Sequence, residues 1–227
     1  MQDSFIIVDL ETTDKVVSNA QIITGCFIHC DKDLNIIDRL DIQSKPSKWD
    51  KTADQASLIH GITWDQAKKF DPWYKVGNHL ASWLKSKPTS HFVCHANRSI
   101  FGQFYCFDYA VLKYNLFDLD HHWDLYKSCP ESQILSTHSI AKHLDIQFGF
   151  DKLNLKSISE TLGLKDFDHH DASADALKCL EILKIFLPRM NVDEFLDKEY
   201  FKTTKDTDDE DEAISTKHAR RSKKLCK

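Results

Sequence analysis

Two carboxylates, Asp9 and Glu11, stand inside the apolar opening segment SFIIVDLETT. The segment is rich in strand-forming residues, and alternation along a strand puts positions i and i+2 on the same face. A strand this apolar is expected to be central and buried, where unpaired carboxylates would cost several kcal/mol each. The hard ions magnesium and manganese suit such a pair better than zinc does, so the spacing indicates a divalent metal site. The alternative is a strand end whose acids point to solvent.

A second pair of chemically useful side chains, His170 and Asp175, stands near the other end in DFDHHDASADALKCLEILKIF. Apolar residues at three- and four-residue spacings predict a helix over 172–187, with Asp171 or Ser173 as its N-cap. Acids are common in the first turn of a helix because the helix dipole favours them. Asp175 can therefore be a metal ligand or a capping acid.

These motifs, with ASLIHGIT at 56–63 between them, have the order and approximate spacing seen in DEDDh (DnaQ-like) 3'-5' exonucleases. The chain resembles this family over roughly residues 4–187. The resemblance implies an α/β, ribonuclease-H-like mixed sheet flanked by helices. It also implies a metal-dependent enzyme that hydrolyses phosphodiester bonds at the 3' ends of DNA or RNA, with two Mg²⁺ or Mn²⁺ ions per site.

The middle motif of the family departs from its usual form here. Family members usually have an Asn shortly followed by Phe-Asp and an apolar helix, whereas Asn97 ends the strand-like HFVCHAN and the next Phe-Asp pair is Phe107 and Asp108. We expect an insertion of several residues, about RSIFGQ, and place Asp108 in the metal-ligand position. Alternatively, Asp108 is only an acid at a helix N-terminus, and the site then lacks one acid.

The resemblance implies a role for each matched residue. Four acids are expected to hold the two ions: Asp9, Glu11, Asp108 and Asp175. His170 is the expected general base, because an imidazole can take a proton from the attacking water near neutral pH. His169 is its rival, but only His170 has the H-x-x-x-x-D spacing to Asp175.

Four further residues are expected to contact substrate: Thr12, Thr13, His60 and Asn97. The threonine hydroxyls follow the first motif and can reach a 3'-OH. His60, from HGIT, can line a nucleotide pocket or be an ordinary packed or surface histidine. Asn97 can meet substrate or cap the end of its strand.

The composition indicates one folded domain over residues 1–200 and a charged, disordered tail over 201–227. The chain has 227 residues and is 41% hydrophobic, which is enough for one sizeable core. The tail is acidic and then basic, with little apolar surface. It holds 8 of the 30 basic and 6 of the 35 acidic residues, so the rest has a net charge near −7. Nucleic acid must then be attracted locally, by metal ions and a few lysines.

Cysteine usage favours a reducing, intracellular, cytoplasmic location. The seven cysteines are odd in number and scattered, without a C-x-x-C pair. No apolar run is long enough to span a membrane, and no secretion signal is recognisable. The expected partners are single-stranded or frayed nucleic acid 3' ends, with a homodimer or a polymerase or repair partner possible.

Two other function classes stay open. The chain could be a non-catalytic nucleic-acid-binding or polymerase-associated subunit with a degenerate exonuclease fold, which the displaced middle motif favours. A zinc hydrolase using His169, His170 and Asp171 lacks a supporting helix-spaced histidine pair.

The hydrophobic pattern predicts a mixed sheet flanked by helices. Strands are expected near 4–10, 20–30, 34–43, 91–96 and 121–126. Helices are expected near 52–59, 73–86, 107–116, 133–144, 155–162 and 172–187.

Overall fold

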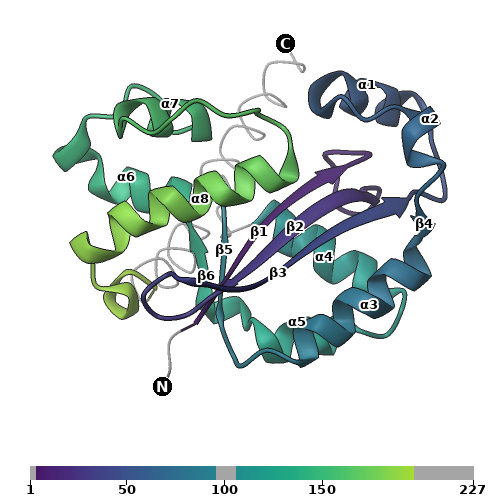
Figure 1. The fold of residues 1–227 in the computed structure, drawn as a ribbon, viewed down its shortest axis with the longest axis horizontal. Coiled ribbons are helices and arrows are strands. Elements are labelled where there is room, and N and C mark those ends of the chain that lie inside the picture. The colour runs from purple at the N-terminus through teal and green to yellow at the C-terminus, as the bar shows by residue number, and fades with distance from the viewer. Residues whose placement is uncertain (1–3, 96–105, 197–227) are drawn as a thin grey trace, which may run out of the picture.

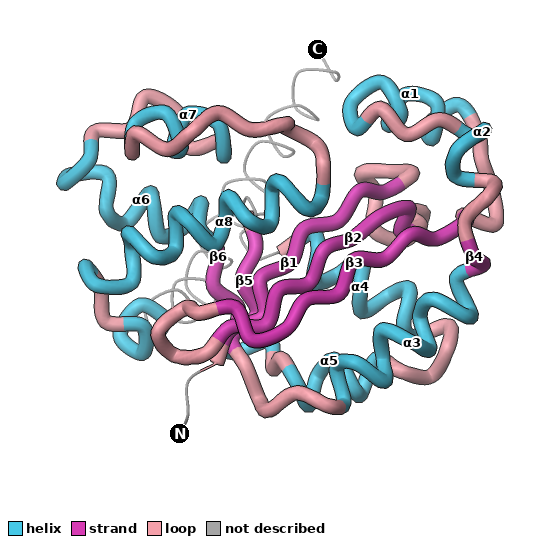
Figure 2. Tube along the Cα trace, in the orientation of Figure 1, coloured by secondary structure: helices cyan, strands magenta, loops and turns pink. Residues whose placement is uncertain are grey.

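The structure, a computed structural model, describes residues 4–95 and 106–196. A six-stranded sheet in the order β4-β3-β2-β1-β5-β6 forms its centre, with helices on both faces (Figures 1 and 2). The strands are β1 (Phe5–Thr12), β2 (Ile22–Cys30), β3 (Ile36–Lys45), β4 (Asp71–Pro72), β5 (His91–Cys94) and β6 (Ile134–Ser136). The helices are α1 (Lys51–His60), α2 (Trp64–Ala67), α3 (Trp73–Lys85), α4 (Phe107–Phe117), α5 (His122–Ser128), α6 (Thr137–Phe148), α7 (Leu155–Thr161) and α8 (Ala172–Phe186), with short 3₁₀ turns at Glu131–Gln133 and Leu187–Arg189. The predicted α/β class is confirmed.

Strand β1 lies in the interior of the sheet, as its apolar sequence predicted. It pairs antiparallel with β2, where Asp9 faces Cys26, and parallel with β5, where Ile7 faces Val93. Strand β6 continues the parallel part beyond β5. Because parallel strands end at the same edge of a sheet, the carboxyl ends of β1 and β5 lie at that edge, and the start of α4 contacts the end of β5 there.

The alternation of β1 separates two hydrophobic layers. Residues 6, 8 and 10 pack in the layer formed with α3, α4 and α5, whereas residues 5 and 7 pack in the layer formed with α6, α7 and α8. Asp9 and Glu11 continue the second series. Helix α8 covers this face of the sheet (Figure 1). Both carboxylates therefore lie on the face that α8 covers, and the predicted one-face arrangement is observed.

One predicted element is wrong, and another is shifted along the chain. The segment predicted as a strand over 121–126 is helix α5, in which Leu125 and Ser128 are buried while Trp123 and Tyr126 are exposed. That burial repeats at three residues, which is a helical spacing rather than the alternation of a strand. The helix predicted from 133 begins only at Thr137, because residues 134–136 pair with β5 as strand β6. Elements α2 and β4 were not predicted.

Several predictions fall on residues outside the described ranges. These are the charged tail of 201–227, the insertion after Asn97 and Asn97 itself. Across 4–95 and 106–196, no helix combines the length and apolar character that crossing a membrane requires.

Candidate active site

Four carboxylates from three separate elements meet at the end of β1. Asp9 and Glu11 come from β1, Asp108 from the first turn of α4 and Asp175 from the first turn of α8. Burial is the main cause that raises the pKa of Asp9 well above its ordinary value, followed by the charges of Asp108 and Asp175. The structure thus brings together all four acids that the sequence analysis proposed as metal ligands.

The middle acid owes its position to the start of α4. Cys106 is the N-cap, and its sulfur accepts the Tyr109 backbone N–H at 3.4 Å. This cap starts the helix two residues before Asp108. Burial raises the pKa of the Asp108 carboxyl, and the nearby backbone of Asp108 itself and of Leu10 in β1 opposes that rise. Asp108 is only 7% exposed. A surface-exposed helix acid would not be buried against β1 in this way.

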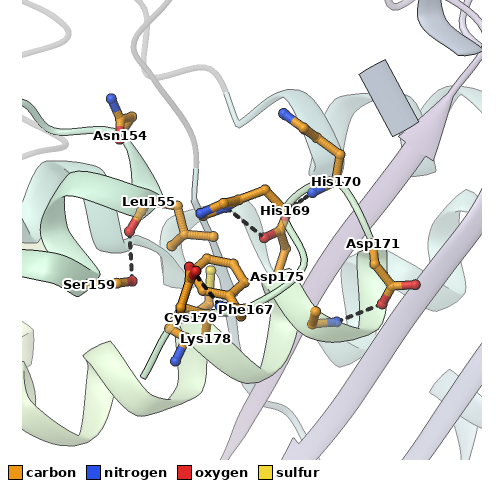
Figure 3. Close-up of polar contacts among 12 residues, drawn as sticks. Asn154, Leu155, Ser159, Phe167, His169, His170, Asp171, Asp175, Lys178 and Cys179 are labelled. Carbon is orange, nitrogen blue, oxygen red and sulfur yellow. Dashed lines mark hydrogen bonds and ion pairs between the residues drawn. The ribbon is translucent and has the colours of Figure 1, made fainter. Parts of the chain in front are cut away.

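The start of α8 fixes Asp175 in a similar manner (Figure 3). Asp171 caps the helix by accepting the Ala174 backbone N–H at 2.9 Å. The backbone N–H of His170 donates to Asp175 Oδ2 at 3.0 Å. His170 holds a left-handed backbone conformation, with φ +67°. Non-glycine residues adopt this region uncommonly, and often at functional sites. The surrounding structure therefore holds His170 in an energetically unfavourable backbone conformation.

The two adjacent histidines occupy different environments (Figure 3). The His169 ring packs against Phe167, with ring centroids 3.9 Å apart, and its Nδ1 lies 3.8 Å from Asp175 Oδ1. His170 is exposed, and one of its ring nitrogens lies within 4.8 Å of carboxylate oxygens of both Glu11 and Asp175. His170 therefore combines solvent access with proximity to the acids.

The site favours protonated acids when no cation is present. Burial, followed by the charges of Asp175 and Asp108, raises the pKa of Glu11 to about 8. Burial also raises the pKa of Asp108 to about 7 and that of Asp175 above its ordinary value. Like charges held together in a desolvated place produce such shifts, and a divalent cation relieves them.

The donor set fits a hard divalent ion. All four groups offer carboxylate oxygens, and Asp175 Oδ1 is buried without a hydrogen-bond partner among the described residues. Such an oxygen is costly to leave unpaired, and it is the type of ligand that magnesium and manganese prefer. We conclude that these residues can hold the ions that the sequence indicated.

The predicted substrate residues have mixed positions. The Thr12 hydroxyl donates to the Asp14 carbonyl at 2.9 Å, and the Thr13 hydroxyl accepts the Gln21 backbone N–H at 3.0 Å. Both hydroxyls thus stabilise the turn after β1, within two residues of Glu11 in the sequence. Asn97 lies outside the described residues.

His60 lies in the same cavity as His170. This cavity of about 390 Å³ has walls from β2, β3, the loop after α1 and the loop 168–173. His60 Nδ1 accepts the Ile62 backbone N–H at 3.1 Å, which fixes the ring. Burial, then the charge of His170, lowers the pKa of His60. The structure therefore brings this predicted substrate residue to the proposed base.

The sequence analysis missed Arg39 as a residue that supports the site. Arg39 lines the cavity from β3 and donates to both oxygens of Asp41, at 2.7 and 2.8 Å. It also donates to Ser173 Oγ at 2.5 Å, in the first turn of α8. Arg39 thus ties β3 to the turn that carries His170. The Arg-x-Asp alternation on a strand was the available signal, but it has no link in sequence to residue 173.

Comparison with known proteins assigns the chain to a family. The model of a family described as exonuclease matches residues 6–183, so the chain belongs to that exonuclease family. This membership confirms the resemblance to an exonuclease family of the DEDDh type. No curated protein matches the chain.

Solved structures agree on the ribonuclease-H-like fold. E. coli exonuclease I in complex with a dT13 oligonucleotide has a TM-score of 0.67 at 17% identity over 83% of this chain and 42% of that one. The zinc-ion-bound form of the E. coli exonuclease I complex with single-stranded DNA has a TM-score of 0.66 at 17% identity over 87% of this chain and 42% of that one. The chain therefore spans less than half the length of these structures.

The raised pKa values predict a pH-dependent stability in the absence of metal. A carboxyl whose folded pKa exceeds its unfolded value stabilises the fold below the unfolded pKa, near 4, and this stability is lost as pH rises through the folded value. With EDTA present, we expect Tm to fall between about pH 5 and pH 8, the window that Glu11 and Asp108 define. Mg²⁺ should restore Tm, and by more at pH 8 than at pH 5.5.

The variant Asp9→Asn tests the origin of this effect. Removing one charge should make the fall of Tm with rising pH smaller, and should raise Tm in EDTA at pH 8 by a few degrees. The size follows because about 1 kcal/mol shifts Tm by about 2–4 °C in a domain of this size. Glu160→Gln, at an exposed acid of α7, serves as the matched control and should leave the dependence of Tm on pH unchanged. A wild-type Tm that does not depend on pH in EDTA contradicts the idea that the acids repel one another.

Proposed function

We propose that this protein is a metal-dependent 3'-5' exonuclease that hydrolyses terminal phosphodiester bonds of DNA or RNA by a two-metal-ion mechanism. One observation carries the proposal. In a chain of the exonuclease family, four carboxylates and an exposed histidine converge at the carboxyl end of β1.

The acids would hold the ions in different ways. Asp9, which lies close enough to Asp108 and Asp175 for their charges to raise its pKa after burial has done so, would help to hold both Mg²⁺ or Mn²⁺ ions. Glu11 and Asp175 would hold the ion nearer the attacking water, and Asp108 would hold the other. When bound, such ions supply charge neutralisation at the phosphate and increase the acidity of water. The protein contributes by desolvating the carboxylates and fixing them through helix caps, so little rearrangement is needed when the ions arrive.

His170 is the proposed general base. Its neutral ring would accept a proton from the water whose oxygen attacks phosphorus, while the bond from phosphorus to the departing 3'-oxygen breaks and that oxygen gains a proton from solvent. The His170 backbone N–H donates to Asp175 Oδ2 at 3.0 Å, and this hydrogen bond supports the role because it holds His170 next to a proposed metal ligand. A general base contributes about 10²–10⁴-fold to such a reaction.

Single-stranded 3' ends are the proposed substrate. Exonuclease I, which shares the fold, has been solved with single-stranded DNA. In this chain His60, at the end of α1, lines the same cavity as His170, and Thr12 and Thr13 follow Glu11 in the sequence. A terminal nucleotide with its phosphate at the acids would meet these residues.

A digestion experiment tests the proposal. The purified protein is incubated with Mg²⁺ or Mn²⁺ and with matched DNA and RNA oligonucleotides, single- and double-stranded, labelled at the 5' end. We expect a ladder of labelled products that shorten one nucleotide at a time, lost in EDTA and in Asp175→Asn. A 3'-phosphorylated oligonucleotide should resist.

Other outcomes have distinct meanings. Release of labelled mononucleotide as the first product would reverse the proposed polarity. Binding of oligonucleotides without any product, in either metal and with every substrate, contradicts the enzyme and supports the non-catalytic alternative.

A further inference from the structure

Two buried cysteines lie in contact beside the acids. The sulfur atoms of Cys94 and Cys106 are 2.7 Å apart, although the residues are twelve positions apart in the sequence. Cys94 is fully buried and Cys106 is 3% exposed. Cys94 is the last residue of β5, and Cys106 is the N-cap of α4.

The separation favours a covalent bond over a shared metal ion. A disulfide needs its sulfurs about 2.05 Å apart, so the pair must approach by less than about 1 Å. A zinc ion with Zn–S bonds of about 2.3 Å would hold two thiolates about 3.7 Å apart in tetrahedral geometry, so the pair would have to separate. Asp108 lies within 4.8 Å of both sulfurs and would also be drawn from the acid cluster.

We propose that Cys94 and Cys106 form a disulfide that fastens the amino end of α4 to β5. The two thiols lose two protons and two electrons. Oxidised glutathione accepts them in two exchange steps, in which a mixed disulfide forms and is then displaced by the second thiol, and two molecules of reduced glutathione leave.

The bond would act on the position of Asp108. The Cys106 sulfur caps α4 through the Tyr109 N–H, and Asp108 follows two residues later. Fastening this cap to the sheet restrains the first turn of α4 relative to β1. The bond itself does not depend on the proposed function, and only its consequence for turnover does.

Burial determines how the bond forms. Both sulfur atoms are shielded from solvent, so glutathione reaches them only when the start of α4 opens locally. Exchange in the folded protein should therefore take hours rather than seconds. The pair therefore forms a structural disulfide slowly and does not act as a rapid redox sensor.

Peptide mapping tests the pairing. The full chain is incubated overnight with oxidised glutathione or with a reducing agent, its free thiols are then alkylated under denaturing conditions, and it is digested. We expect a peptide containing Cys94 linked to one containing Cys106 in the oxidised sample only. Recovery of both cysteines in fully alkylated form, or of links to other cysteines instead, overturns the proposal.

Thermal melting provides a second readout. A disulfide that closes this short loop reduces the entropy of the unfolded chain, so the oxidised protein should melt several degrees above the reduced one. Cys106→Ser should lose this difference while keeping an oxygen that can cap α4. Cys30→Ser, at a buried cysteine elsewhere in the sheet, should keep it. An equal difference in Cys106→Ser contradicts the pairing.

Neither readout requires nuclease activity. A linked peptide in a protein without turnover would reject the proposed function and retain this inference. Turnover without the linked peptide would reject this inference and retain the proposed function.

Discussion

Asp108→Asn is expected to lower metal-dependent hydrolysis by more than about 10²-fold while the protein stays folded. Loss of one fixed electrostatic stabiliser typically costs 10²–10³-fold in turnover. The asparagine keeps the shape of the side chain but not its charge, so the ion that Asp108 is proposed to hold would be bound poorly. Turnover on a 5'-labelled single-stranded oligonucleotide at several Mg²⁺ concentrations measures the loss.

The fold should survive this change because Asp108 is a source of repulsion in the metal-free protein. Its pKa is raised to about 7, mainly by burial, so the ionised form is disfavoured near neutral pH. Replacing it should leave Tm in EDTA unchanged or slightly higher. A substantial fall in Tm would instead indicate that the side chain mainly stabilises the start of α4.

A matched control lies on the same helix. Asp118 is an exposed acid at the carboxyl end of α4, and Asp118→Asn should leave turnover unchanged. If Asp108→Asn keeps wild-type turnover, the middle acid must be sought elsewhere, and the placement of the motif after an insertion is wrong.

The sequence allowed prediction of those site residues that stand in regular local patterns. Asp9 and Glu11 share a face because a strand alternates, and Asp175 lies in a first turn because apolar spacing shows where α8 begins. Strong periodicity of this kind survives in the fold. This periodicity, together with the family resemblance, predicted the α/β class. It also predicted that the motif of Asp9 and Glu11 meets the motif of Asp175.

Short elements were harder to predict because they contain too few residues to show a period. Strand β6 has three residues, and only its pairing with β5 distinguishes it from the helix that follows. Helix α5 has seven residues and places His122 and Trp123 beside each other on a partly exposed surface. A run rich in aromatic residues has high strand propensity, and packing against α3 and α4 overrides it here.

Long-range contacts had no local signal at all. Arg39 meets Ser173 across 134 positions, and the sulfur of Cys94 meets that of Cys106 although the cysteines show no familiar spacing. Counting cysteines in the sequence indicated unpaired thiols. The fold brings two of them together because β5 ends where α4 begins.

The second large effect is expected at His170. His170→Ala should lower the catalytic constant by about 10²–10⁴-fold, the usual contribution of a general base. Metal binding should persist, because the four carboxylates remain. Rates at saturating Mg²⁺ measure the first expectation, and Mg²⁺-dependent stabilisation in thermal melts measures the second.

His169→Ala is the matched control, at the adjacent residue and with the same side chain removed. Its ring packs on Phe167 and lies near Asp175, so it should affect packing and the orientation of that acid more than proton transfer. We therefore expect a much smaller loss of turnover. A larger loss for His169→Ala would transfer the base role to that residue and break the H-x-x-x-x-D spacing.

The pH dependence of the rate distinguishes a base from a merely structural histidine. Only a neutral imidazole can accept a proton, so the wild-type rate should rise with pH through the range in which histidines titrate and then level off. Saturating Mg²⁺ is essential, because Glu11 and Asp108 otherwise hold protons up to about pH 8 and about pH 7 and add their own pH dependence. His170→Ala should lose this rise and retain a low, flatter profile, whereas His169→Ala should keep it. Since a structural role for His170 would lower the whole curve without changing its shape, an unchanged rise in His170→Ala would assign the proton to another group.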